Sequence, residues 1–102
     1  MKTIGANLNI TDVATLSSAI SLNTSTSVLV QASNIDRIYF SISSPDSHAI
    51  WLKLQAASVD NDKKGIYIPK NGFWEMQPDD KYTGEICAIA DTGTPSVYTT
   101  EY

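Results

Sequence analysis

The only histidine, His48, is the first residue to consider for chemistry, because Ser, His and Asp are the residue types of a hydrolytic triad. Asp46 and Ser47 immediately precede it. In a triad the histidine contacts the nucleophile on one side and the carboxylate on the other, and neighbours within one tight turn do not reach that geometry. We therefore expect His48 to be a solvated turn residue.

A pattern typical of calcium-binding loops begins at Asp60 and Asp62, with Gly65 at the expected turn position. The pattern then fails, because Lys64 occupies the place of the next oxygen ligand and Asn71 that of the closing bidentate Glu. A surface calcium site built from other acidic loop residues stays open as an alternative. Those residues are Asp79, Asp80 and Asp91. The sequence predicts no metal ligand and no cofactor.

Two carboxylates and one thiol remain as candidates for catalysis. Glu75 and Glu85 both fall in alternating strand patterns that place them on the solvent side, away from any apolar site suited to acid–base catalysis. Cys87 is the only cysteine and lies in the apolar run Ile-Cys-Ala-Ile-Ala, so we expect it to be buried and unreactive. No catalytic residue is predicted, and we expect that the chain is not an enzyme.

The aromatic side chains are the other candidates for a functional site. Several of them fall opposite the aliphatic positions of their strands, namely Trp51, Trp74, Tyr39 and Tyr67. Exposed Trp and Tyr side chains anchor protein interfaces or stack against sugar rings. The alternative is that they cover a second face of the core, and the sequence does not separate the two.

Composition limits the class of partner. The 102 residues fit one domain with one core, and 42% of them are hydrophobic. The formal net charge is −4 and the seven basic residues are scattered, which argues against a nucleic-acid partner. No run of residues is long and apolar enough for a membrane span or a signal peptide, so we expect no membrane partner and a mature chain that begins near Met1.

Seven short runs rich in Val, Ile, Tyr, Phe and Trp alternate with turn-forming clusters, as in all-β domains. They cover residues 27–32, 37–43, 49–57, 65–68, 72–77, 82–90 and 96–101. The hydroxyl-rich stretch 15–27 disfavours a helix, and we expect extended chain there. We predict a single antiparallel β-sandwich of about seven strands, with a small partly closed β-barrel as the alternative.

Alternation predicts the direction of individual side chains. Ile38, Phe40 and Ile42 should face the core while Arg37 and its alternate neighbours face solvent. The same reasoning places Ile50, Leu52 and Leu54 inside, and Trp51, Lys53 and Gln55 outside. The turn at 44–47 predicts a hairpin between these two runs, and Asn71-Gly72 predicts a tight hairpin turn between the next two.

From residue 34 to residue 101 the order of short motifs resembles that of small bacteriophage virion accessory proteins, the β-sandwich modules of capsid decoration, head-fibre and tail-associated proteins. The motifs are an Asn-x-x-Arg opening at 34–37, Ile-Trp-Leu at 50–52, Gly-Ile-Tyr-Ile-Pro at 65–69, Gly-aromatic-x-Glu at 72–75, Tyr-Thr-Gly-Glu-Ile-Cys-Ala-Ile-Ala at 82–90, and Val-x-x-x-Glu at 97–101.

This resemblance implies a non-enzymatic structural protein of a virus particle that binds a capsid or tail protein. It also implies a symmetric homo-oligomer located in the virion and assembled in the bacterial cytoplasm. Residues 1–23 would form an extended N-terminal segment that helps docking, and residues 24–102 the sandwich domain. The alternative function is a carbohydrate- or receptor-binding module that uses the four aromatic side chains named above.

Overall fold

The computed structural model describes residues 14–44, 47–57 and 63–102, and all regular structure in these ranges is β-strand. Asp46, Asp60 and Asp62, which belong to the triad and calcium patterns, lie outside the described residues. Among the described residues there is no helix that could cross a membrane.

Every one of the seven predicted strands is present, six in shorter form and the last with the predicted bounds. They are β3 (Val28–Gln31), β4 (Phe40–Ser43), β5 (Ile50–Lys53), β6 (Ile66–Ile68), β7 (Phe73–Glu75), β8 (Ile86–Ala90) and β9 (Ser96–Glu101). The hydroxyl-rich stretch is extended, as expected, and contributes β1 (Thr15–Leu16) and β2 (Ile20–Ser21). β-Branched and hydroxyl side chains explain this choice, because they lose rotamer freedom in a helix.

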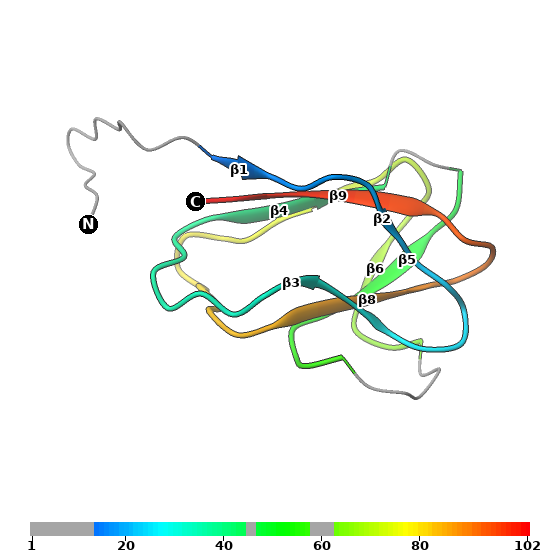
Figure 1. Ribbon diagram of the computed structural model, residues 1–102, viewed down its shortest axis with the longest axis horizontal. Helices are drawn as coiled ribbons and strands as arrows, with labels where there is room; N and C mark the ends of the chain where they lie inside the picture. Colours follow the sequence, from blue (N-terminus) through cyan, green and yellow to red (C-terminus); the bar gives the residue numbers. More distant parts are fainter. Residues whose placement is uncertain (1–13, 45–46, 58–62) are drawn as a thin grey trace.

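Two antiparallel sheets pack face to face (Figure 1), so the prediction of a β-sandwich is confirmed and the described residues form no closed barrel. The first sheet has the order β1-β9-β4-β7, with β2 also pairing with β9. The second sheet has the order β3-β8-β5-β6. Since β1 and β2 lie one after the other along β9, each sheet has four strand positions.

The core lies between the sheets and is aliphatic, with one aromatic ring at its centre. Phe40 and Ile42 enter it from the first sheet, and Ile50 and Leu52 enter it from the second, all with no exposed surface. Five successive residues of β8 are buried, because this central strand is covered on both faces. Burial of side chains of this size stabilises a fold by about 1.5 to 3 kcal/mol each.

The described part of the N-terminal segment belongs to the first sheet. Thr15 pairs with Glu101 and Ile20 with Val97, while between the two pairings Ser17 Oγ accepts a hydrogen bond from the Thr99 amide at 2.9 Å. A side-chain oxygen here replaces the backbone acceptor of a regular ladder. Within residues 14–23, the short strands β1 and β2 thus lie along β9 at one edge of the first sheet.

The predicted strand pairings are wrong. The runs at 37–43 and 49–57 do not form a hairpin, because β4 pairs with β7 and β9 whereas β5 pairs with β6 and β8. Asn71 does adopt the positive φ (58°) expected of a turn, but the turn links β6 to β7 in the other sheet. The alternation of apolar and polar residues shows only that one side of a strand is buried. Strands of both sheets bury one side in the same core, so this pattern does not tell which sheet a strand joins.

In the described residues, β5 and β6 are the only consecutive strands that form a hairpin. Gly65 lies directly before β6. Its φ is +112°, and a Cβ atom at this position would lie against the carbonyl oxygen of Leu52. We predict that Gly65→Ala lowers the free energy of unfolding by about 1 to 3 kcal/mol in urea titrations, because both the backbone angle and the space favour glycine.

Asn71→Gly is the matched control, since glycine also tolerates the positive φ found there. We expect its free energy of unfolding to stay within about 0.5 kcal/mol of the parent value. An equally small effect of Gly65→Ala would contradict the backbone geometry described for this hairpin.

Candidate functional site

Among the described residues no three His, Cys, Asp or Glu side chains come together as a metal-binding group. Asp79, Asp80 and Asp91 therefore do not assemble a calcium site within this part of the chain. Cys87 is fully buried, as predicted. Glu75 is exposed and Glu85 is half-buried.

His48 differs from the expected solvated turn residue. Its side chain packs against Gly93, where an added Cβ would lie 2.7 Å from Nε2, and its Nδ1 is buried without a hydrogen-bond partner in the described structure. The residues next to His48 in sequence give no sign of this contact, because Gly93 belongs to the loop between β8 and β9. His48 thus helps to close this end of the sandwich.

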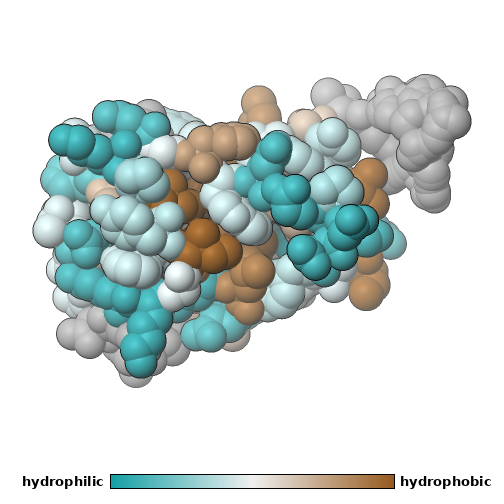
Figure 2. Space-filling model, turned by 180° about the vertical axis from the view of Figure 1, so that it is seen from behind, coloured by the Kyte–Doolittle hydropathy of each residue, from teal (hydrophilic) through white to brown (hydrophobic). Residues whose placement is uncertain are grey.

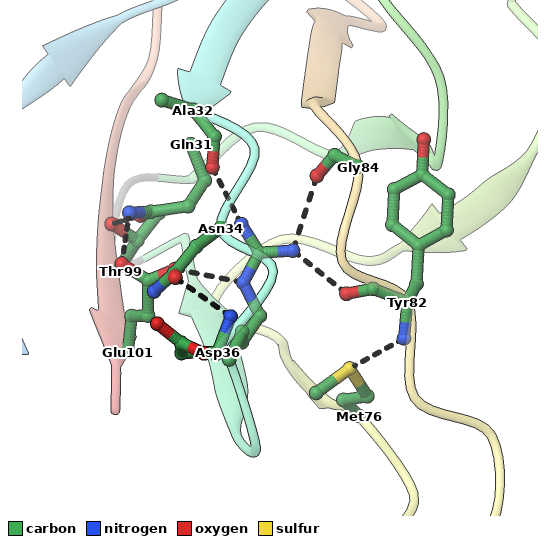
Figure 3. Close-up of polar contacts among 10 residues, drawn as sticks. Gln31, Ala32, Asn34, Asp36, Met76, Tyr82, Gly84, Thr99 and Glu101 are labelled. Atoms are coloured by element: carbon green, nitrogen blue, oxygen red, sulfur yellow. Dashed lines mark hydrogen bonds and ion pairs between the residues drawn. The ribbon is translucent and has the colours of Figure 1, made fainter.

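The largest cluster of polar side chains surrounds Arg37, which is 1% exposed although alternation predicts an outward side chain. Its Nε donates to Glu101 Oε2 at 2.8 Å, and its Nη2 donates to the Ala32 carbonyl at 2.6 Å. Its Nη1 donates to the carbonyls of Tyr82 and Gly84 at 2.7 and 3.1 Å. Figure 3 shows the guanidinium in the middle of these acceptors.

Glu101 extends this cluster across the two sheets. Its Oε1 accepts a hydrogen bond from Gln31 Nε2 at 2.8 Å, and its Oε2 also accepts one from Asn34 Nδ2 at 3.3 Å. Gln31 in turn accepts from Thr99 Oγ1 at 2.9 Å. Gln31 belongs to the second sheet, whereas Thr99 and Glu101 belong to the first (Figure 3).

A buried guanidinium with this many partners acts as a structural group. The ion pair is 0% and 12% exposed at its two side chains, so a ligand has little access to either charge. The partners of Arg37 are backbone carbonyls and one carboxylate already engaged by amides. We assign the cluster to the framework of the sandwich.

Removing the guanidinium leaves the Glu101 carboxylate without its cation and four hydrogen bonds unmade. We predict that Arg37→Met lowers the free energy of unfolding by about 3 to 5 kcal/mol, the usual cost of breaking one side of a buried pair. Chemical denaturation followed by far-ultraviolet circular dichroism measures it.

The double variant Arg37→Met with Glu101→Gln separates this charge effect from simple loss of packing. We expect the double variant to be less unstable than the sum of the two single changes, because the glutamine leaves no buried charge. Additive losses would show that the ion pair is not the source of the effect.

The four aromatic residues predicted as a site do not lie together. Trp74 faces the core beside Phe40, with ring centroids 6.4 Å apart, so it covers the core as the alternative reading held. Trp51 and Tyr67 lie on the outer face of the second sheet. Tyr39 lies on the outer face of the first.

The outward-facing residues of the first sheet form a surface with several exposed aromatic rings, which we call the sheet-1 face. Phe73, Ser43 and Tyr98 form one cross-strand row, and Glu75, Ser41, Thr100 and Leu16 form the next. Tyr39 and Tyr102 complete it as a stacked pair 5.2 Å apart. Exposed fractions of 59% for Phe73 and 44% for Tyr98 leave both rings open to a partner.

Phe73 and Tyr98 were not among the predicted site residues, although the sequence carried a signal for both. Adjacent residues of a strand point to opposite sides, so Phe73 must face outward once Trp74 faces the core. In the same way Val97 and Thr99 are buried, which places Tyr98 outside. The cross-strand row that joins Phe73 and Tyr98 depends on which strands are neighbours, and the position of each residue along its own strand does not show it.

A hydrogen bond ties the stacked pair to the middle of the sheet-1 face, where the Tyr39 hydroxyl donates to Glu75 Oε1 at 2.8 Å. A side-chain hydrogen bond with Ser41 lowers the pKa of Tyr39, but burial, the negative charge of Glu75 and the nearby Tyr102 together raise this pKa above its ordinary value. Tyr39 therefore keeps its proton and remains a hydrogen-bond donor beside the carboxylate.

The outer face of the second sheet offers a smaller aromatic pair. The rings of Trp51 and Tyr67 lie 5.0 Å apart and are tilted by 59°, and Trp51 Nε1 donates to Asp91 Oδ1 at 3.2 Å. Tyr67 is 52% exposed. The Trp51 side chain is half-buried, so this pair offers one exposed ring where the sheet-1 face offers several.

The rest of the described surface has no comparable aromatic group. A shallow hollow opens beside the β5–β6 hairpin and is lined by residues 52–55 and 64–66. Seen from behind in Figure 2, hydrophobic side chains show near the centre of the view and again toward its edges, with hydrophilic side chains between them. The aromatic rings of the sheet-1 face are therefore the strongest candidate for a binding site.

The raised pKa of Tyr39 gives a test of the sheet-1 face. We predict that Glu75→Gln lowers the pKa of Tyr39, because the charge that disfavours the tyrosinate is removed, and ultraviolet difference titration follows it. Since folding raises this pKa, the folded state holds the proton more tightly. This contribution to stability is fully present below the pKa of the unfolded state and is lost as the pH rises from there through the higher pKa of the folded state.

Tyr39→Phe identifies the transition of Tyr39 within the titration curve and serves as the control. If Glu75→Gln left the curve unchanged, the hydrogen bond and the charge interaction described between these two side chains would be contradicted.

Comparisons with known proteins give no assignment. No family model matches the chain, and no curated protein and no solved structure matches it either. The class that the fold defines is an antiparallel β-sandwich with an exposed aromatic sheet face.

Proposed function

We propose that this chain is a non-enzymatic structural component of a bacteriophage particle, a capsid decoration or other virion accessory protein that binds the particle surface. The proposal rests on the order of motifs between residues 34 and 101, which resembles that of such modules. It also rests on the place of these motifs in the fold.

Five positions from three of the motifs form the cluster around Arg37. Asn34 and Arg37 come from the first motif, Tyr82 and Gly84 from the fifth, and Glu101 from the last. Residues that lie 45 to 64 positions apart in sequence thus form one set of contacts with the guanidinium. Several of the motif residues therefore belong to the framework of the sandwich, and this is the single observation that supports the proposal.

The proposed partner is a capsid or tail protein, and the proposed assembly is a symmetric homo-oligomer. Within the described residues, each sheet ends in strands that pair on one side only, β1, β2 and β7 in the first sheet and β3 and β6 in the second. Unpaired strand edges invite association, and closed symmetry is one way of covering them. Many copies on one particle would also strengthen individually weak contacts.

Quantitative mass spectrometry of density-purified particles tests the proposal, with the major capsid protein as the internal standard. We expect a fixed copy ratio that persists when loosely bound proteins are washed off with salt. Light scattering of the isolated protein then measures its oligomeric state, for which we expect a symmetric oligomer. If washed particles contain no copy of this chain, the proposed virion role is refuted.

A further inference from the structure

We propose that the sheet-1 face binds a neutral oligosaccharide, with Phe73 and Tyr98 as the two stacking groups. This inference concerns a ligand of the chain itself and does not rest on the virion role. It also relocates the carbohydrate site expected from the sequence, because only Tyr39 of the four aromatic residues predicted there lies on this face.

The spacing of the aromatic rings fits a chain of sugar rings. Phe73 and Tyr98 are each one strand away from Ser43, so their Cα atoms are about 9.6 Å apart, twice the usual strand spacing. The small side chain of Ser43 leaves the space between the two rings unfilled by a larger residue. An apolar face of a sugar ring can then stack on either aromatic ring.

Polar groups suited to sugar hydroxyls lie beside these rings. Glu75 is exposed, and among the described residues only Tyr39 donates a hydrogen bond to its carboxylate. The carboxylate therefore has acceptor capacity for ligand hydroxyl groups. The hydroxyls of Thr100 and of the exposed Tyr102 lie on the same face and both donate and accept.

The charge of the face distinguishes between ligand classes. Of the residues that form the sheet-1 face, none is Lys or Arg, and Glu75 is the only carboxylate. Phosphate-rich and other anionic ligands need cationic partners, which this face does not supply. A neutral sugar has no such need.

The size of the face favours a small ligand over a second protein. It spans the six residues of β9, about 20 Å, by three strand spacings, about 14 Å. That projected area is well below the roughly 800 Å² per partner of a standard protein interface. A short oligosaccharide fits within it across the strands, along the row of Phe73, Ser43 and Tyr98.

Nuclear magnetic resonance titration of the ¹⁵N-labelled chain tests the proposal. The probes are four neutral tetrasaccharides, namely cellotetraose, chitotetraose, maltotetraose and mannotetraose. We expect at least one of them to shift the amide signals of Ser43, Phe73, Glu75 and Tyr98 in a saturable way. The amide signals of Trp51 and Tyr67 on the opposite sheet should stay unchanged.

Three alanine variants then identify the stacking groups. We expect Phe73→Ala and Tyr98→Ala each to weaken the binding by about tenfold, as truncation of an anchoring aromatic residue does. Tyr67→Ala is the matched control, because Tyr67 is exposed to a similar extent (52%) on the other sheet, and its affinity should equal that of the parent. The thermal unfolding curve of each variant confirms that the fold is intact.

Several outcomes would overturn the proposal. One is the absence of saturable shifts with all four tetrasaccharides, and a second is a set of shifts that maps to Trp51 and Tyr67. A third is a change of the parent chain from oligomer to monomer in Tyr98→Ala, which would make this face a protein interface. None of these results alters the copy ratio measured on particles, so the two proposals fail independently.

Discussion

The buried ion pair between Arg37 and Glu101 fixes one end of the sandwich, because it joins strands of both sheets through a single guanidinium. Arg37 lies just before β4 and Glu101 ends β9, while the carbonyl groups that complete the coordination precede β8 or follow β3. A charge buried to this degree is tolerated only when its partners are in place. The ends of four strands must therefore assemble together.

This arrangement determines where a binding site can lie. The interior is filled by the aliphatic core and, at one end, by the cluster around Arg37. The central strand β8 is buried on both faces, since the outward side chains Cys87 and Ile89 are also fully covered. On the first sheet the outward side chains of Phe73 and Tyr98 remain exposed, and it is there that we propose a binding site.

The sequence predicts the strands well and their pairing poorly, for physical reasons. Alternation in β4 and β5 reveals the buried side of each strand, and Phe40, Ile42, Ile50 and Leu52 all occupy the core as predicted. It is wrong at the strand ends, because Ile38 and Leu54, expected inside, lie just outside the two strands and are exposed, and Lys53, expected outside, is buried. The same pattern arises whichever sheet a strand joins, so the hairpins expected at 44–47 and at Asn71-Gly72 were wrong. Pairing depends on contacts between distant residues, and local patterns do not contain them.

The burial of Arg37 and the position of the aromatic site also depend on contacts between distant residues, which local sequence patterns do not contain. A guanidinium is predicted to face solvent unless its acceptors are known, and here the acceptors of Nε and Nη1 lie 45 to 64 residues away. Of the predicted aromatic residues, Trp74 faces inward, because its cross-strand neighbour is Ile42, whose side chain faces the core. The side chains of Phe73 and Tyr98 could be placed only after neighbouring positions were known to be buried.

Hydrogen exchange at the Nε–H group of Arg37, observed directly by nuclear magnetic resonance, is the most direct test of this account. We expect a resolved Nε–H signal at neutral pH whose proton exchanges as slowly as the most protected amides of β8, because this group is exposed only when the sandwich unfolds. Fast exchange, while the amides of β8 stay protected, would contradict the claim that this ion pair holds the two sheets together.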